Sequence, residues 1–233
     1  MKGKLYLIPS TLGESSSLDV LPPVILKVIE NLKHFIVEDI RTARRFLKKI
    51  KPDIIIDELS FQVLNEHTPQ DEIPNLLETL LAGNDAGLLS EAGLPCIADP
   101  GSLLVGFAHE NGIKVVPLSG PSSIFLALMA SGFNGQNFAF HGYLPVDKKD
   151  RIQKIKELEA AAYQKDQTQI FIETPYRNVQ MVESLAQACR PYTKICVAVD
   201  LTLPSEKIII SIASQCHLLK EINKKPAVFL LYR

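Results

Sequence analysis

Short apolar runs rich in Val and Ile alternate along this chain with longer amphipathic stretches. Such alternation is typical of βαβ units, in which helices join neighbouring parallel strands and pack on the sheet. In the first half of the chain, strands are expected near residues 4–8, 34–38, 53–57, 86–90 and 113–118, with helices in most of the intervals between them. The chain is therefore predicted to have an α/β fold.

The second half of the chain also alternates, but its last apolar runs lie closer together. Strands are expected near residues 138–142, 169–173, 194–199, 207–211 and 227–232, and helices near 148–163 and 177–189. Closely spaced strands indicate that part of this sheet is antiparallel. The segment Ser-Gly-Pro-Ser-Ser at 119–123 can turn the chain. We therefore expect two α/β domains that meet at a ligand cleft: residues 1–118 with a mostly parallel sheet and residues 119–233 with a mixed sheet.

One helix has clear boundary residues. Asp99 is a good N-cap, and Pro100 suits the first helical position because its missing N–H has no partner there. Gly112 follows the last apolar position and is a typical helix stop. The pattern predicts a helix that begins directly after Asp99.

The charge of the chain is nearly balanced. Its 25 Lys and Arg against 26 Asp and Glu give a net charge of −1, so no overall positive field attracts nucleic acid, although a local basic patch stays open. The apolar runs fall far short of the roughly 18 residues that a membrane span requires. The N-terminal run at 5–8 is also shorter than a signal-peptide core. We therefore expect a cytoplasmic protein with no membrane partner.

Several common site motifs are missing from the sequence. The four cysteines show no C-x-x-C spacing and the five histidines lie in separate segments, so no metal site is expected and the thiols should be reduced. No Walker A sequence is present, no G-x-G-x-x-G follows an expected strand, and no serine lies in G-x-S-x-G. These absences disfavour ATP-driven, ordinary Rossmann and α/β-hydrolase chemistry.

The segment 87–101, GLLSEAGLPCIADPG, is the strongest candidate for a ligand-binding loop. It runs from a buried strand through several Gly and Pro residues into a capped helix. Ligands of open α/β sheets bind at such carboxyl-end loops, where small residues allow the backbone to approach a ligand. The alternative is a tight turn in which Asp99 is only a helix cap. The polar loop at 9–17 follows another strand and is either a second wall of the site or a plain surface loop.

Two further segments each place a glutamate and an arginine at the end of an expected strand. They are Glu38-Asp39-Ile40-Arg41 and Glu173-Thr174-Pro175-Tyr176-Arg177. An arginine can bind an anionic substrate with two hydrogen bonds, and a carboxylate can accept a proton from a hydroxyl. The alternative is that Asp39 caps the next helix and that each glutamate pairs with its own arginine.

Six segments in this order resemble a known family. They are LYLIPSTLG, VEDIRTARRFL, LLSEAGLPCIADPGSLLV, VVPLSGPSSIFLALMASG, FAFHGYLP and IFIETPYRN. Together they resemble the tetrapyrrole methylase superfamily of class III methyltransferases, and within it the bacterial ribosomal RNA small-subunit cytidine 2′-O-methyltransferases. The resemblance implies S-adenosylmethionine as methyl donor, two α/β domains with the cofactor in the cleft between them, a homodimer, and ribosomal RNA or the small ribosomal subunit as partner.

The resemblance also assigns roles to individual positions. It implies that the cofactor is lined by residues from four segments: Ser90, Ala92, Gly93, Leu94, Pro95, Ile97, Ser122, Ser123, Tyr143, Leu144, Pro226 and Ala227. Glu38 and Glu173 are hypothetical catalytic residues that activate or orient the acceptor hydroxyl. Arg41 and Arg177 are the hypothetical binding residues for its phosphates.

The chain departs from the RNA-methylating group at several positions. Glu14 and Ser15 replace Asn and Leu of the first loop, and Val199 and Leu203 replace Arg and Lys. The loss of two cations weakens the electrostatic case for RNA. Two alternatives to RNA methylation therefore stay open: a methyltransferase for a small tetrapyrrole-like acceptor, and a silent module that binds the cofactor without transferring methyl.

Overall fold

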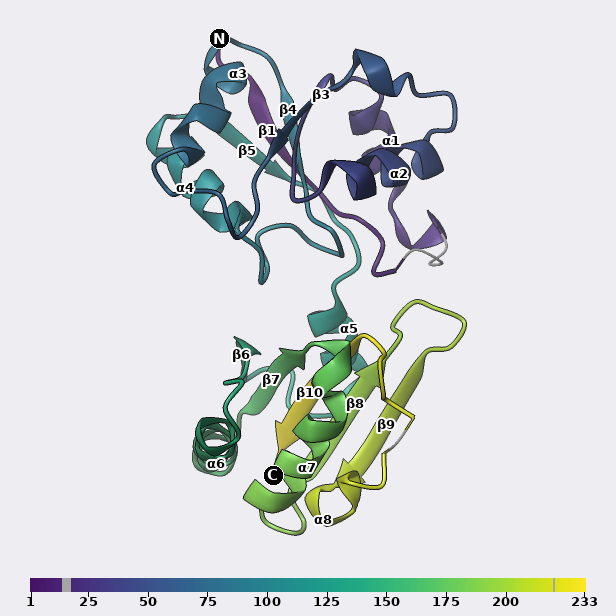
Figure 1. The fold of residues 1–233 in the computed structure, drawn as a ribbon, viewed down its shortest axis with the longest axis vertical. Helices are drawn as coiled ribbons and strands as arrows, with labels where there is room; N and C mark the ends of the chain where they lie inside the picture. Colours follow the sequence, from purple (N-terminus) through teal and green to yellow (C-terminus); the bar gives the residue numbers. More distant parts are fainter. Residues whose placement is uncertain (14–17, 220) are drawn as a thin grey trace. The chain divides into compact units, whose positions relative to one another are not determined.

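The computed structural model describes residues 1–13, 18–219 and 221–233, so Glu14 and Ser15 lie outside the described residues. The chain divides into two compact units, Met1–Ser122 and Ser123–Arg233, each built around its own five-stranded sheet (Figure 1). The domain boundary is predicted between residues 118 and 119. The observed division, after Ser122, lies within the segment 119–123 that follows this position. The predicted α/β class is confirmed, with a parallel sheet in the first unit and a mixed sheet in the second.

The sheet of the first unit is entirely parallel. Its strands are β1 (Lys4–Ile8), β2 (His34–Val37), β3 (Ser60–Val63), β4 (Ala86–Leu89) and β5 (Lys114–Pro117). They lie in the order β3-β2-β4-β1-β5, which places β4 between β2 and β1. Because all five strands run in one direction, the loops that follow them gather at a single edge of the sheet.

Helices cover both faces of this sheet (Figure 1). The helix α1 (Pro23–Ile29) and the helix α2 (Ile40–Ile50) pack with alternate strand residues such as Phe35 and Val37. The intervening Ile36 points to the opposite face and packs with η3 (Ile73–Leu77), α3 (Glu78–Leu81) and α4 (Gly101–Glu110). The short helices η1 (Leu18–Val20) and η2 (Ile56–Glu58) complete the unit. Burial of strand residues on both faces is what a parallel sheet requires.

Two details of the expected first unit are wrong. The apolar run at 53–57 is not a strand: Ile54 is buried in the core beneath α2, Ile56 begins η2, and the edge strand β3 starts only at Ser60. Here the apolar side chains belong to a connecting segment and fill the core from there. A short apolar run does not by itself show whether the residues form a strand or such a segment. The helix α4 also begins at Gly101, one residue later than predicted, with Pro100 before it.

The second unit has a mixed sheet. Its strands are β6 (Phe138–Tyr143), β7 (Thr168–Glu173), β8 (Lys194–Val199), β9 (Lys207–Ile212) and β10 (Ala227–Tyr232). They lie in the order β6-β7-β10-β8-β9; β6 and β7 are parallel, and the other neighbours are antiparallel. The predicted antiparallel character of the final strands is confirmed.

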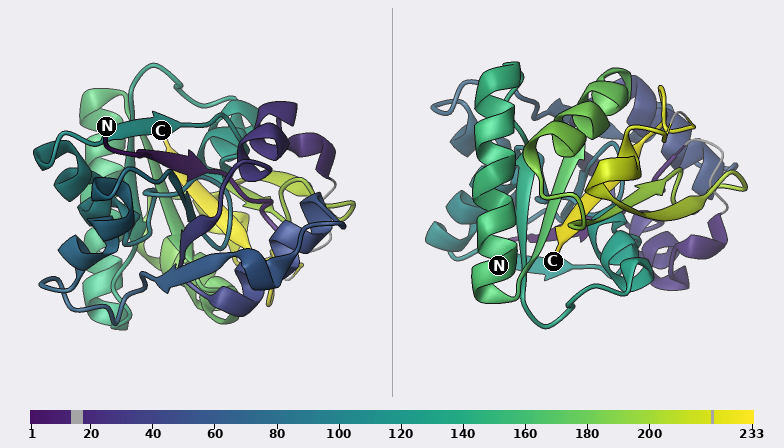
Figure 2. Two further views of the ribbon diagram at one scale, coloured as in Figure 1. Left: turned by 90° about the horizontal axis from the view of Figure 1, so that it is seen from above. Right: turned by 90° about the horizontal axis from the view of Figure 1, so that it is seen from below.

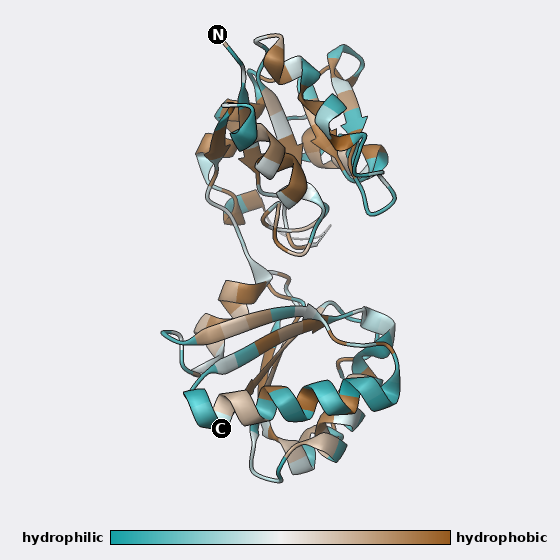
Figure 3. Ribbon diagram, turned by 90° about the vertical axis from the view of Figure 1, so that its left-hand side faces the viewer, coloured by the Kyte–Doolittle hydropathy of each residue, from teal (hydrophilic) through white to brown (hydrophobic). Residues whose placement is uncertain are grey.

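The helices of the second unit also cover both faces of the sheet. The long helix α6 (Lys148–Lys165) packs beside α7 (Asn178–Ala188), which contacts η4 (Pro175–Arg177) and α8 (Ala213–Cys216) (Figure 2). Phe171 and Phe229 pack with these helices, and their rings stack with 5.7 Å between centroids. The helix α5 (Ser123–Ser131) packs against β10, β8 and β9. Figure 3 shows hydrophobic residues along the strands of the sheets, which agrees with this burial.

Three general features complete the description. None of the described helices is both long and apolar enough to span a bilayer. The thiols of Cys96, Cys189, Cys196 and Cys216 are free, and the last two are buried. Within the described residues, no group of three or more His, Cys, Asp or Glu side chains is arranged to hold a metal ion.

Candidate active site

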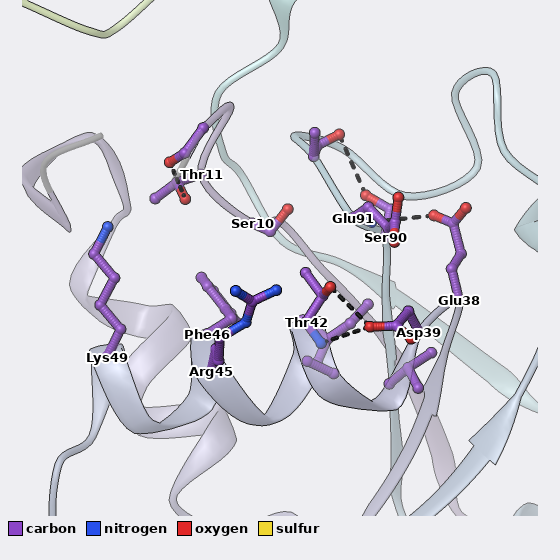
Figure 4. Close-up of a pocket in the computed structure, with 15 residues that line it drawn as sticks. Ser10, Thr11, Glu38, Asp39, Thr42, Arg45, Phe46, Lys49, Ser90 and Glu91 are labelled. Atoms are coloured by element: carbon purple, nitrogen blue, oxygen red, sulfur yellow. Dashed lines mark hydrogen bonds between the residues drawn. The ribbon is translucent and has the colours of Figure 1, made fainter. Parts of the chain in front are cut away.

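A pocket of about 480 Å³ lies at the carboxyl edge of the first sheet (Figure 4). The strands β1, β4 and β2 are neighbours and run parallel, so the segments that follow them meet there. The pocket is lined by residues from these three segments and from α2: Ser10, Thr11, Gly13, Val37, Glu38, Asp39, Thr42, Ala43, Arg45, Phe46, Lys49, Leu89, Ser90, Glu91 and Ala92. Its volume lies in the range of roughly 300 to 1,000 Å³ that is typical of small-ligand sites.

The charged side chains of the pocket are separated by sign. Figure 4 shows Arg45 and Lys49 on α2 at one side, and Glu38 and Glu91 at the other. Apolar side chains also form part of the wall, among them Phe46, which lies near Arg45 in Figure 4. The pocket therefore suits a ligand with an anionic end, an apolar ring and a group that can donate a proton.

Glu38 is the carboxylate most clearly placed for chemistry. Its side chain lines the pocket, and its Oε1 accepts a hydrogen bond from the backbone N–H of Glu91 at 3.1 Å. Burial raises the pKa of Glu38 above its ordinary value; the Glu91 hydrogen bond opposes this, and the negative charges of Asp99 and Glu91 add to it. Among the described residues no ion pair joins Glu38 to Arg41, which is exposed. Glu38 is thus a carboxylate whose proton affinity is increased.

Asp39 has a structural role at the start of α2. Its carboxylate accepts hydrogen bonds from the backbone N–H and the hydroxyl of Thr42, at 2.7 and 2.8 Å. These two bonds are the main cause of the lowered pKa of Asp39. The simpler interpretation of Asp39, that it caps the following helix, is confirmed.

The loop after β4 is tightly packed against its neighbours in the first unit. The backbone N–H of Ser10 donates to the carbonyl of Gly93 at 2.9 Å. Gly93 has a φ of +75°, and a Cβ there would lie 2.9 Å from Leu12 Cδ2 and 3.2 Å from the carbonyl oxygen of Pro121. Only glycine fits this position without displacing a neighbour.

Asp99 holds the far end of the same loop. Its carboxylate accepts from the backbone N–H of Cys96 and of Gly101, each at 2.8 Å. Burial raises the pKa of Asp99, and these two hydrogen bonds oppose the rise. Cys96 and Ala98 have φ values of 69° and 63°, which are unusual for residues other than glycine. Such conformations persist only where surrounding contacts maintain them, and they are frequent at ligand sites.

The first unit meets two requirements of a nucleoside-containing ligand such as S-adenosylmethionine. The hydroxyl of Ser10 lines the pocket, is buried, and has no hydrogen-bond partner within the described residues. A buried hydroxyl without a partner is costly unless a ligand satisfies it. In the loop after β4, Ala92 and Ile97 are exposed and offer apolar contact, and Ala92 lines the same pocket. These residues fit the predicted cofactor.

A second group of predicted residues gathers at one edge of the second sheet. In the register of the strands, Glu173 lies opposite Ala227 and Ala227 lies opposite Val199. Tyr143 pairs with Ile172 on the neighbouring strand. The sheet thus collects, within the second unit, the predicted residues Tyr143, Leu144, Glu173, Pro226 and Ala227.

Glu173 and Arg177 form a buried ion pair in this group. Arg177 Nη2 lies 2.6 Å from Glu173 Oε1, and the backbone N–H of Thr174 donates to the same oxygen at 2.6 Å. The side chain of Glu173 is 0% exposed and that of Arg177 is 22% exposed. Glu173 Oε2 has no partner among the described residues. The alternative in which Glu173 pairs with its own arginine is confirmed.

The predicted site residues therefore fall into two groups, one in each unit. Glu38, Ser90 and Ala92 line the pocket, and Gly93, Leu94, Pro95 and Ile97 belong to the loop beside it. Ser122 is buried at the end of the first unit, whereas Ser123 begins α5. Val199 is buried at the end of β8.

Sequence reasoning missed the contribution of α2 to the pocket. Thr42, Arg45, Phe46 and Lys49 line it, although none was proposed for the site. Their spacing is a usable signal: residues three or four apart on a helix share one face, and these four follow that pattern directly after a strand that ends in Glu38.

The family-model comparison matches residues 4–215 to the tetrapyrrole (corrin/porphyrin) methylases. The chain belongs to this family. Among curated relatives, the ribosomal RNA small subunit methyltransferase I of Vibrio cholerae is 32% identical over 209 residues, covering 88% of this chain and 67% of the relative. The protein of the same name from Escherichia coli O157:H7 is 31% identical, with coverages of 89% and 68%. The chain thus spans about two thirds of these relatives, and 57% of a Streptococcus pyogenes relative.

Solved structures share the tetrapyrrole methylase fold. The methyltransferase CobJ matches with a TM-score of 0.68 and 17% identity, covering 99% of this chain and 94% of that one. A uroporphyrin-III C-methyl transferase from Thermus thermophilus, complexed with S-adenyl homocysteine, matches with a TM-score of 0.62 and 16% identity, covering 99% and 98%. The predicted family is confirmed, and it is a family of S-adenosylmethionine-dependent methyltransferases.

Proposed function

We propose that this chain transfers a methyl group from S-adenosylmethionine to the 2′ oxygen of a ribose in small-subunit ribosomal RNA. The names of the curated relatives support the substrate class. The observation that carries the chemistry is Glu38, a pocket carboxylate of raised pKa that is hydrogen-bonded to the first residue of the loop at 91–97. This arrangement puts a proton acceptor next to the proposed cofactor loop.

The first unit supplies the groups that such a reaction needs. The cofactor supplies an electrophilic methyl group carried on a positively charged sulfur. Glu38 accepts the proton of the ribose hydroxyl, a role that contributes roughly 10² to 10⁴ to a rate. The pocket wall around Phe46 and Leu89 holds the acceptor and excludes water. Holding the two reactants in line is worth about 7 to 11 kcal/mol at best.

The proposed cofactor contacts come from both units. In the first unit they are Ser90, Ala92, Gly93, Leu94, Pro95, Ile97 and Ser122, supported by the unpartnered Ser10 hydroxyl and the constrained loop backbone. In the second unit they are Ser123, Tyr143, Leu144, Pro226 and Ala227, supported by the family resemblance. Arg41 and Arg177 are proposed phosphate contacts. Glu173, which is buried and paired, is better suited to position Arg177 than to act as a base.

Calorimetric titration with S-adenosylmethionine tests the cofactor site. The variant Ala92→Trp places an indole at the exposed loop position that also borders the pocket. The matched control is Ala82→Trp, an exposed alanine that precedes β4 at the opposite edge of the sheet. The wild type and the control should bind alike, and Ala92→Trp should lose at least tenfold in affinity. Equal binding by all three proteins would remove the loop from the site.

Transfer of tritium from labelled cofactor tests the acceptor. Incubation with unmodified small ribosomal subunits should label the RNA. The phosphodiester bond next to the labelled ribose should resist alkaline cleavage, because that cleavage needs a free 2′ hydroxyl. Label in a tetrapyrrole but not in RNA would favour the small-molecule alternative. Binding of the cofactor without label in either acceptor would favour the silent module.

We also propose that the protein works as a homodimer in the cytoplasm. The homodimer rests on the family resemblance, and the location rests on the short apolar runs of the sequence. Light scattering behind a sizing column should give twice the chain mass of 25.8 kDa. A monomer mass at micromolar concentration would contradict it.

A further inference from the structure

The helix α2 carries five cationic side chains in a chain of net charge −1. They are Arg41, Arg44, Arg45, Lys48 and Lys49. This is the local concentration of positive charge that the overall charge conceals. The five side chains are not equivalent, because they leave the helix in different directions.

Two of the five cations contact their own unit away from the pocket. The guanidinium of Arg44 lies over the ring of Phe61, 5.5 Å from its centroid. Lys48 Nζ donates to the carbonyl of Pro52 at 3.1 Å. Neither residue lines the pocket as the structure describes it.

Arg45 and Lys49 lie on the pocket side of the helix. They are four residues apart, so one stands above the other on the same face. Both are exposed and both line the pocket, and Figure 4 shows them across it from Glu38 and Glu91. Arg45 is close enough to Asp39 to help lower the pKa of that carboxyl, but the Asp39 carboxylate is also bonded to Thr42.

We infer that Arg45 and Lys49 bind the phosphates that flank the acceptor ribose and thereby turn its 2′ hydroxyl toward Glu38. This inference rests on the proposed function and adds the residues that orient the substrate. A guanidinium binds phosphate through two parallel hydrogen bonds, and an ammonium binds it as a point charge. The ribose then lies between the cations and the carboxylate, on the side of the pocket that Thr42 lines.

The shape of the charged surface favours RNA over a tetrapyrrole carboxylate. Arg41, Arg45 and Lys49 follow one another at four-residue steps, which are roughly 6 Å each along a helix. A row of cations that continues beyond the pocket suits a chain of phosphates. An isolated carboxylate needs only the two cations inside the pocket.

The test compares two double variants of the same helix. Arg45→Gln/Lys49→Gln removes the pocket-side cations, and Arg44→Gln/Lys48→Gln removes the same charge from the other side. Glutamine has nearly the helix propensity of arginine and lysine, so both variants should fold. Affinity for small-subunit ribosomal RNA is measured by filter binding at several salt concentrations, and affinity for S-adenosylmethionine by calorimetry.

The pocket-side variant should lose at least roughly tenfold in RNA affinity. The slope of log affinity against log salt should become shallower by roughly 1.4, the value for two contacts to a single strand. The control should lose less than threefold, and both variants should bind S-adenosylmethionine like the wild type. Equal losses in the two variants, or no loss in either, would overturn the role of Arg45 and Lys49.

Two further outcomes separate this inference from the proposed function. If the wild type methylates RNA and the pocket-side variant is unimpaired, only the inference fails. If the wild type binds the cofactor but neither binds nor methylates RNA, the proposed function fails and the inference fails with it. Saturable binding of uroporphyrin III that depends on Arg45 and Lys49 would identify the anion as a carboxylate and would also overturn it.

Discussion

Two segments of this chain each carry a glutamate and an arginine at a strand end, yet they have different structures. Glu38 and Arg41 follow β2 in the first unit; in the second, Glu173 is the last residue of β7 and Arg177 follows it. Glu173 is buried and lies 2.6 Å from its arginine. Glu38 is half-buried, faces a pocket, and bonds to the backbone of Glu91, while Arg41 is exposed.

The residues between each pair account for the difference. After Glu38, the capping residue Asp39 starts α2 at once, and Arg41 becomes an exposed residue of its first turn. After Glu173, Pro175 begins the short helix η4, and Arg177 at its end returns to the glutamate. The same two side chains are therefore available to a ligand in one unit and consumed by an internal contact in the other. Composition at a strand end does not by itself identify a catalytic carboxylate.

The largest effect should come from Glu38→Gln. Loss of the proton acceptor should lower kcat for methyl transfer by roughly 10² to 10⁴. Because the pKa of Glu38 is raised, its ionised form is less stable in the folded protein than in the unfolded one. The variant should therefore be at least as stable as the wild type at neutral pH. Kinetics with saturating cofactor measure the first effect, and thermal unfolding measures the second. A fully active Glu38→Gln variant would show that Glu38 is not the base.

The arginines test the comparison through stability. Arg177→Ala leaves the Glu173 carboxylate buried and unpaired, which should lower the free energy of unfolding by about 3 kcal/mol. Arg41→Ala removes an exposed side chain and should change it by less than about 0.5 kcal/mol. Urea denaturation of both variants gives the two values. Similar values would mean that the two segments are energetically alike despite their geometry.

The pH dependence of the rate tests the environment of Glu38. A base must be ionised to accept a proton, so the rate should rise with pH through the pKa of Glu38. Burial raises that pKa, and the rise in rate should therefore be centred above the ordinary range of a glutamate. The profile of kcat/KM reports the group in the free protein. A rise centred at or below the ordinary value would contradict the assigned environment.

Much of the fold follows from the period of the apolar runs. Within the described residues, nine of the ten strands are close to their expected positions, because each combines a short apolar run with turn residues at its ends. The run at 53–57 fails because apolar residues in a connecting segment can fill the core as well as strand residues do. The sequence also predicts that the end of β2 and the loop after β4 lie at one edge of the sheet, since parallel strands bring their carboxyl ends together.

The remaining details of the site depend on tertiary contacts. The burial of Glu173 is set by the strands on either side of it, β6 and β10, and no local pattern records it. The pocket role of Arg45 and Lys49 depends on which face of α2 turns away from the core. That face follows from the buried Ala43 and Leu47, so the sequence contains the signal once the helix is assigned.

A smaller effect than that of Arg177→Ala should come from Asp39, which separates capping from catalysis in the first segment. Asp39→Ala removes the acceptor for the N–H of Thr42 and should lower Tm by a few degrees at neutral pH. The pKa of Asp39 is lowered in the folded protein, so its contribution is complete above the unfolded pKa and is lost as the pH falls through the folded pKa. The Tm difference should therefore shrink on acidification. Asp39→Asn keeps a capping side chain without a charge, and should stay close to the wild type in Tm while losing most of the pH dependence. If Asp39→Ala instead abolished methyl transfer with little change in Tm, Asp39 rather than Glu38 would be the carboxylate that acts on the substrate.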